Sequence, residues 1–301
     1  MTHSRLLRIG VAVALATNTS LALAAPARPR VAPAPARSML FRVRAPNGGA
    51  TIYLLGSVHL LSPDAAQLPA TVDSAFAKSK VVAFETSLDT VQMRAQELLG
   101  RAQYKGGATL STSISAATAA HTDSLLRSYG LSIAQVNAFK PWFVSMLMSQ
   151  LVMQKANFKA DLGVDMQLNA RAKSASKSVI GLEPVDFQLG LFDTISPEDQ
   201  EKMLMQGQGP DSTMHQLMTI KDAWVAGNTV KLDSLLNSQM GRSASLFAKL
   251  VTDRNKSWIP KLEELARGKD DALVVVGAAH LVGKEGVLAL LKAKGYTIEQ
   301  L

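Results

Sequence analysis

The sequence predicts an α/β protein with a mixed central β-sheet and a large helical layer. Short apolar runs rich in Val, Ile and Leu alternate with longer helix-forming stretches, as in βαβ units. The run Ala272–Val276 is typical of a strand buried on both faces of a sheet. Hydrophobic residues make up 47% of the 301 residues and charged residues 19%, a balance that supports a sizeable core.

The N-terminal residues 1–24 are expected to be a signal peptide. Arg5 and Arg8 form a basic start, and a short apolar run ends in small residues that suit cleavage after Ala24. A retained membrane anchor is the alternative, which the shortness of the run disfavours. Residues 25–38, rich in Ala, Pro and Arg, predict a disordered linker. We therefore expect a periplasmic or secreted protein without a stable membrane span.

Residues 39–301 are predicted to form one domain that begins with a hairpin and a βαβ unit. Met39–Val43 and Thr51–Leu55 flank a Pro- and Gly-containing turn, which predicts two antiparallel strands. A helix is expected at Pro69–Lys78 and leads into a strand at Val81–Phe84. This alternation favours a mixed sheet.

Helical periodicity from about residue 88 to 177 predicts a helical insertion. Pro and Gly pairs then punctuate a second helical stretch over residues 184–267. The remaining predicted elements are a strand at Ser178–Leu182, the strand Ala272–Val276, a helix at Gly286–Lys294 and a terminal strand at Tyr296–Glu299.

Two of the predicted strands are followed by a glycine and, three residues later, a histidine. The pairs are Gly56 with His59 and Gly277 with His280. Glycine permits a sharp turn and close backbone approach, and ligands collect at the carboxyl ends of strands in α/β sheets. One such histidine alone could be a hydrogen-bonded structural side chain. Two in matching contexts favour one shared site and an internal duplication.

Glu85 ends a third strand-like run and is expected to reach the same edge of the sheet. Two imidazoles and a carboxylate can hold a divalent ion, which acidifies bound water into a nucleophile. His59, Glu85 and His280 are thus candidate metal ligands and catalytic residues. Without metal, the same set could perform general acid–base chemistry. Alternatively, Glu85 is an acid at the start of the following helix.

Four further residues are supporting candidates. Glu183 follows a strand and could orient a histidine or cap a helix, and Asp165 lies near a helix start and is similarly ambiguous. Arg254, next to Asn255, could bind a carboxylate or an oxyanion. Packing of Arg254 on Trp258, one helical turn later, is the structural alternative.

Composition and missing motifs exclude several classes of protein. The chain has no cysteine, so disulfides, thiolate nucleophiles and Cys-based zinc sites are excluded. The net charge of +8 is scattered and aromatics are only 5%, which disfavours nucleic-acid binding. Neither a Gly-x-Ser-x-Gly elbow nor a His-Glu-x-x-His motif is present.

An ordered set of motifs along residues 40–301 resembles the TraB/GumN group of bacterial proteins, which is similar to the Tiki metalloproteases of animals. The resemblance rests on these residues: Gly56 to His59, Glu85, Gly163 to Asp165 with Leu168, Gly181 to Glu183, Gln188, Arg254, Asn255, and Val276 to Gly283 with Gly286. It implies a metal-dependent site of His59, Glu85 and His280, supported by Glu183, Asp165, Arg254 and Asn255, and it implies peptide hydrolysis with manganese, cobalt or zinc.

Two functional hypotheses follow. The first is an exported metallohydrolase of the peptidase type, in which Arg254 steadies the oxyanion. The second is a non-catalytic periplasmic protein that sequesters a peptide or an envelope ligand in the same cleft. Haem capture by exposed histidines is a weaker third hypothesis.

Overall fold

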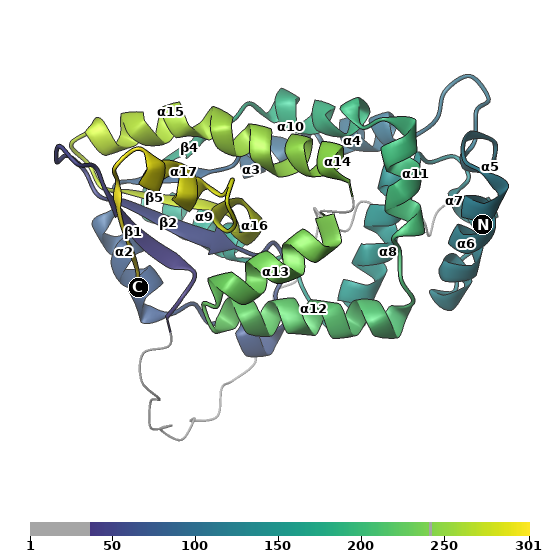
Figure 1. The fold of residues 1–301 in the computed structure, drawn as a ribbon, viewed down its shortest axis with the longest axis horizontal. Coiled ribbons are helices and arrows are strands. Elements are labelled where there is room, and N and C mark those ends of the chain that lie inside the picture. The colour runs from purple at the N-terminus through teal and green to yellow at the C-terminus, as the bar shows by residue number, and fades with distance from the viewer. Residues whose placement is uncertain (1–36, 241–242) are drawn as a thin grey trace.

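The computed structural model describes residues 37–240 and 243–301, in which a six-stranded mixed sheet is covered by helices (Figure 1). The predicted signal peptide and the linker up to residue 36 lie outside the described residues. The predicted fold class is confirmed. The strands are β1 Leu40–Arg44, β2 Ile52–Ser57, β3 Val81–Phe84, β4 Ser178–Gly181, β5 Ala272–Gly277 and β6 Thr297–Gln300, in the sheet order β4-β3-β5-β2-β1-β6.

Strand β5 lies between β2 and β3, and all three are parallel. Leu273 is in register with Tyr53 of β2 on one side and with Val82 of β3 on the other. β1 pairs with β2 as the predicted antiparallel hairpin, and β6 is antiparallel to β1. The carboxyl ends of the strands that lead to His59, Glu85 and His280 therefore meet at one edge of the sheet. The internal duplication stays a prediction.

Helices cover both faces of the sheet, as right-handed crossovers require. Helices α2 Ala70–Lys78 and α9 Val164–Ser174 connect parallel strands across one face, whereas α15 Asp253–Arg267 and α17 Val287–Ala293 connect strands across the other. The central strands are apolar and fully buried between these layers, with Val274 at 0% exposure. This burial explains the continuous apolar run that the sequence shows.

A helical lobe extends from the end of the sheet to which β2, β3 and β5 point (Figure 1). It has its own apolar cluster, which includes Leu126, Leu147 and Leu204. The lobe draws on helices before and after β4, because α8 (Pro141–Lys155) packs against both α11 (Pro197–Met205) and α12 (Pro210–Val225). The predicted insertion at 88–177 thus differs in two respects: α9 packs on the sheet, and later helices complete the lobe.

The other helices have these bounds: α3 Leu88–Met93, α4 Ala95–Ala102, α5 Leu110–Ser113, α6 Ala116–Ser128, α7 Ile133–Val136, α8 Pro141–Lys155, α10 Val185–Leu191, α11 Pro197–Met205, α12 Pro210–Val225, α13 Thr229–Met240, α14 Ala244–Phe247 and α16 Ala278–Leu281. Short 3-10 turns occur at Pro63–Ala65 and Phe192–Thr194, and a π-helical turn at Ala248–Thr252 leads into α15.

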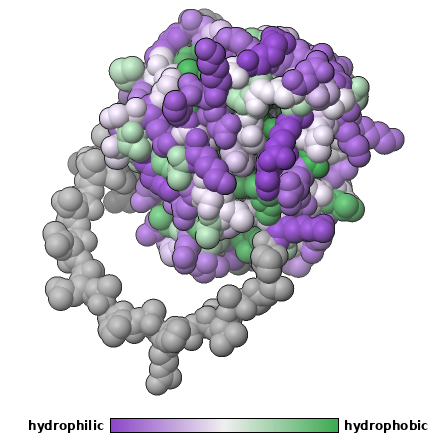
Figure 2. Space-filling model, turned by 90° about the vertical axis from the view of Figure 1, so that its left-hand side faces the viewer, coloured by the Kyte–Doolittle hydropathy of each residue, from purple (hydrophilic) through white to green (hydrophobic). Residues whose placement is uncertain are grey.

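The surface opposite the helical lobe is mainly hydrophilic, with small scattered apolar spots (Figure 2). None of the helices in the described part of the chain combines the length and apolar character needed to cross a membrane.

Candidate active site

A cavity of about 360 Å³ opens where β2, β3 and β5 end. The sheet edge and α15 provide its polar wall, which consists of Ser57, His59, Glu85, Arg254, Gly277 and His280. The structure thus brings four predicted site residues, His59, Glu85, Arg254 and His280, to one cavity. Three others, Asp165, Glu183 and Asn255, do not line the cavity but hydrogen-bond to residues that do.

His59 is held by the carboxylate of Asp165. The distance from His59 Nδ1 to Asp165 Oδ2 is 3.0 Å, and Ser57 Oγ donates to the other carboxylate oxygen at 2.8 Å. Asp165 is buried, whereas the His59 side chain is 65% exposed and lines the cavity. The negative charge of Asp165 raises the pKa of His59 above its ordinary value of 6.5. This pairing fixes one ring nitrogen and leaves Nε2 for the cavity.

Gly163 brings Asp165 to His59. Gly163 precedes α9, and a Cβ atom on it would lie 2.1 Å from the carbonyl oxygen of His59. The next amide, of Val164, donates to Val58 O at 3.1 Å. The absence of a side chain therefore allows the start of α9 to pack directly on the loop that carries His59. The signal in the sequence for this close packing is a glycine two residues before an acidic residue at the start of a helix.

We expect Gly163→Ala to destabilise the protein by roughly 1–3 kcal/mol and to displace His59, because backbone atoms on both sides leave no room for a methyl group. Urea denaturation measures the first effect and the activity assay below the second. Gly100→Ala is the matched control. Gly100 lies inside α4 with open space around it, so alanine is expected to stabilise by about 0.5–1 kcal/mol. Equal effects of the two changes would contradict the packing argument.

The two motif glycines have different roles. Gly56 lies inside β2, and a Cβ there would lie 3.2 Å from Ala278 Cα and from two side-chain atoms. Gly277 is the last residue of β5 with φ −51°, and its N–H donates to Glu85 Oε1 at 2.7 Å. The expected sharp turn is therefore absent at Gly56, whereas at Gly277 the chain passes directly from β5 into α16. The expected close backbone approach is found at Gly56.

Glu85 is bound to Arg254 in a buried ionic cluster. Arg254 Nη2 donates to Glu85 Oε2 at 2.5 Å and to Glu183 Oε1 at 2.6 Å, and Gln188 Nε2 reaches Glu85 Oε2 at 3.3 Å. Burial disfavours the charge on Glu85. At the acidic pH at which Glu85 would take up a proton, the charges of His280, Arg254 and His59, together with the Gly277 amide, outweigh burial and lower the pKa of Glu85 to about 2. Glu85 is therefore an ionised carboxylate rather than a proton donor.

Arg254 combines both predicted interactions. Its guanidinium carbon lies 4.9 Å from the centre of the Trp258 ring, and Trp258 Nε1 donates to Glu183 Oε2 at 2.9 Å. Its five N–H groups bind Glu85, Glu183, His280 and the carbonyl of Leu250. An oxyanion would have to displace one of these partners. Glu183 orients an arginine and a tryptophan, and it is Asp165 that contacts a histidine.

His280 is held in one tautomer by Asn255. The Asn255 amide nitrogen donates to Glu285 O at 2.8 Å, which turns its oxygen towards His280 Nδ1 at 2.7 Å. Nδ1 therefore carries the proton, and Nε2 accepts from Arg254 Nη1 at 3.1 Å. Burial lowers the pKa of His280 to about 4, against the attraction of Glu85. His280 is thus a neutral imidazole at neutral pH.

We expect the free energy of unfolding to fall as the pH drops from about 6.5 to about 4. Over this range the unfolded chain protonates His280 whereas the folded protein does not, so the contribution of His280 is fully present above pH 6.5 and is lost as the pH falls through 4. Glu85 acts in the same direction at lower pH, between 4.5 and about 2. The raised pKa of His59 acts in the opposite direction at higher pH, between 6.5 and about 9. Urea midpoints of the wild type and of His280→Gln measure the effect. An unchanged decline in His280→Gln would contradict it.

The donor types suit a divalent ion, but they do not form a ready-made metal site. Glu85 Oε1 lies 3.7 Å from His280 Nε2, a separation that fits two ligands of one ion, and the His59–Asp165 pair is typical of metal-binding histidines. Within residues 37–240 and 243–301, however, no three His, Asp or Glu side chains stand together as ligands. Arg254 holds Glu85 and His280, so its Nη1 would have to leave His280 first.

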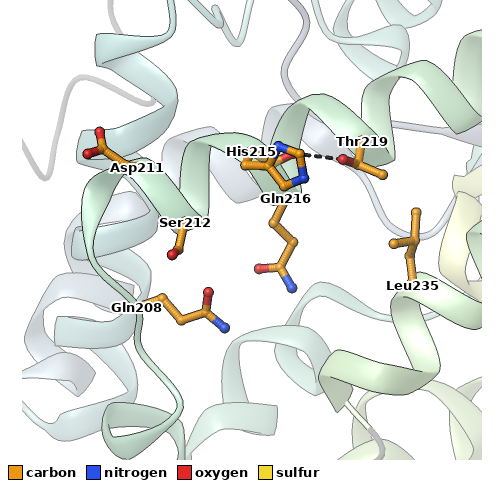
Figure 3. Close-up of a pocket in the computed structure, with 7 residues that line it drawn as sticks. All are labelled: Gln208, Asp211, Ser212, His215, Gln216, Thr219 and Leu235. Carbon is orange, nitrogen blue, oxygen red and sulfur yellow. Dashed lines mark hydrogen bonds between the residues drawn. The ribbon is translucent and has the colours of Figure 1, made fainter.

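A second cavity, of about 520 Å³, lies beside α12 and differs in chemistry. Figure 3 shows Gln216 projecting between Gln208 and Leu235. His215 is exposed there, and its carbonyl accepts from Thr219 at 2.8 Å. Because amides and hydroxyls dominate this lining, the ionic cluster at the sheet edge is the stronger candidate for catalysis.

The fold and the cavity define an α/β protein with two histidines, an arginine and carboxylates at the carboxyl ends of its parallel strands. The chain belongs to the TraB/PrgY/gumN family, whose model matches residues 39–300. It is similar to the proteins named "Uncharacterized protein YbaP" of Escherichia coli strain K12 and Shigella flexneri. Each is 24% identical over 251 residues, which cover 81% of this chain and 89% of the relative. No solved structure matches.

Proposed function

We propose that this protein is an exported, metal-dependent hydrolase that cleaves peptides. The observation that carries the proposal is the convergence of the His59–Asp165 pair and the Glu85–Arg254–His280 cluster on one cavity. The site combines an ionised carboxylate, Glu85, with a neutral imidazole, His280, and with His59, whose ring is oriented by a carboxylate. Hydrolysis uses groups of such different charge close to one substrate.

His59, Glu85 and His280 would hold a manganese, cobalt or zinc ion, which supplies an acidified water when bound. The chain's own residues have distinct tasks. Asp165 keeps Nε2 of His59 facing the cavity, Arg254 keeps Glu85 ionised, and Asn255 keeps the proton of His280 on Nδ1. The proposed export of the protein rests on the signal-peptide pattern of the N-terminus. The proposal that it does not bind nucleic acid rests on its scattered charge and few aromatic residues.

The test is hydrolysis of a quenched-fluorescence peptide library by the purified protein with added manganese, cobalt or zinc, before and after chelation. We expect cleavage that chelation abolishes and one of these metals restores. If no peptide is cut with any of the three, the hydrolase is ruled out. Cleavage that chelation leaves unchanged would retain the hydrolase and remove the metal.

The second candidate is a non-catalytic protein that sequesters a peptide or envelope ligand. The full engagement of Arg254 favours it, because the cluster is a satisfied network without a vacant donor on that side chain. Peptide binding that survives both chelation and Glu85→Gln would support this function over the first.

A further inference from the structure

The cavity has a second wall, which is apolar and comes from the helical lobe. Apart from the ionic cluster, the cavity is lined by Met153, Phe158, Leu217, Ile220, Leu232 and Leu236. These side chains come from α8, from the segment after it, and from α12 and α13. The sheet edge thus provides the ionisable groups, and the helices provide an apolar surface.

The apolar wall belongs to the cavity rather than to the outer surface. Phe158 and Leu232 are buried, and Leu217, Ile220 and Leu236 are half-buried with the cavity beside them. When a ligand covers apolar surface that is exposed to water in a cavity, the free energy of the complex falls. An apolar group of a ligand is therefore the natural occupant of this side.

The two walls meet at His59. Leu60 and Leu61 follow His59 directly and also line the cavity, and Leu61 is bridged to Lys159, next to Phe158. At about 360 Å³ the cavity is near the small end of ligand pockets, which span roughly 300–1,000 Å³. Such a space suits one large side chain with its flanking backbone.

Lys221 is the charged residue of this wall. It is nearly buried, lines the cavity and pairs through Nζ with Asp64 Oδ2 at 2.9 Å. Its Nζ also lies 3.8 Å from Asp222 Oδ1, so its charge is compensated by two carboxylates. A lysine or arginine of a ligand would instead have to bury its charge against apolar side chains, which costs free energy. Lysine and arginine side chains are therefore disfavoured as occupants.

We propose that the helical wall is a specificity subsite that seats one large apolar side chain, such as leucine or phenylalanine, next to the peptide bond presented to His59 and Glu85. The subsite rests on the proposed function in that the ligand is a peptide. The residues of the subsite bind the apolar side chain and so position the peptide, whereas the groups at the sheet edge act on the peptide bond.

The experiment compares fluorescein-labelled peptides that differ at one central residue, either Ala, Leu, Phe, Asp or Lys. Their binding to the His59→Ala variant is measured by anisotropy, so that turnover does not interfere. We expect the Leu and Phe peptides to bind about tenfold or more tightly than the Ala peptide, and the Lys peptide most weakly. Equal affinities, or no binding of any peptide, would overturn the subsite.

Leu217→Gln and Met218→Gln form a matched pair on α12. Both changes put the same helix-compatible amide at neighbouring positions, but Leu217 lines the cavity whereas Met218 is 38% exposed outside its lining. Leu217→Gln is expected to reduce the preference for Leu over Ala several-fold, and Met218→Gln to leave it unchanged. Equal effects of the two changes would overturn the assignment of the wall.

The wild-type protein with added metal separates the two proposals. A binding preference without cleavage of any of these peptides would reject the hydrolase and leave the subsite standing. Cleavage at equal efficiency for all central residues would reject the subsite and leave the hydrolase. If both proposals hold, Leu217→Gln should raise KM for the Leu peptide and change kcat little, because it removes binding that is uniform along the reaction.

Discussion

Replacing Arg254 with methionine is expected to destabilise the protein by about 3–5 kcal/mol, the largest stability effect that we anticipate for one residue. The change keeps much of the side chain's volume but removes the charge between Glu85 and Glu183, which are both buried. Two carboxylates would then face each other without a counter-charge. Urea denaturation at pH 7 measures the loss.

Arg94→Met is the matched control for this prediction. Arg94 also pairs with two carboxylates, those of Glu97 and Asp186, but it does so at the surface, so its loss should cost about 1 kcal/mol or less. Adding Glu183→Gln to Arg254→Met should recover part of the stability because one unpaired charge disappears. A cost for Arg254→Met no larger than that for Arg94→Met would refute the importance of the cluster. Arg254→Lys retains the charge and provides a measurement if the methionine variant does not fold.

Replacing His59 with alanine is expected to lower kcat for a cleaved peptide by about 10²–10⁴, because the residue serves as metal ligand or as acid–base group in the cavity. Its side chain is 65% exposed, so stability should change by only about 1 kcal/mol. Asp165→Asn is expected to cause a smaller loss, since it disturbs the tautomer of His59 and leaves the ring in place.

His215→Ala controls for the loss of an imidazole elsewhere. His215 lines the cavity beside α12, away from the cluster at the sheet edge, and its removal should leave kcat unchanged. Steady-state kinetics with the same peptide and thermal unfolding of all three variants give the comparison. A His59→Ala protein with full activity would remove His59 from the catalytic machinery.

The strands and the grouping of the main site residues could be predicted from the sequence. The sequence predicts β3 with its observed bounds, because charged residues stand on both sides of its apolar run. The adjacency of β2, β3 and β5 could not be predicted, since local patterns carry no information on which strands pair. The ends of the strands were nevertheless the right place to look, because parallel strands deliver their loops to one edge.

The contacts that orient the site residues could not be predicted from the sequence, for a physical reason. Acids near helix starts are common, so nothing in the chain distinguishes Asp165, which orients His59, from Glu183, which binds Arg254. Ser57 lies within the motif, yet its bond to Asp165 joins residues 108 positions apart. The apolar wall was also missed, because Leu217 and Leu232 follow the ordinary helical pattern of core residues.

The central position of β5 determines when the fold can form. β2 and β3 do not pair with each other, because β5 stands between them, and β5 begins at residue 272. A growing chain thus carries both early strands for most of its length without the partner that joins them. Such long-range pairing makes folding slow and leaves strand edges open to wrong partners in the meantime. The cavity is complete only when the chain has been made as far as His280, so truncation before β5 would remove the centre of the sheet and the site together.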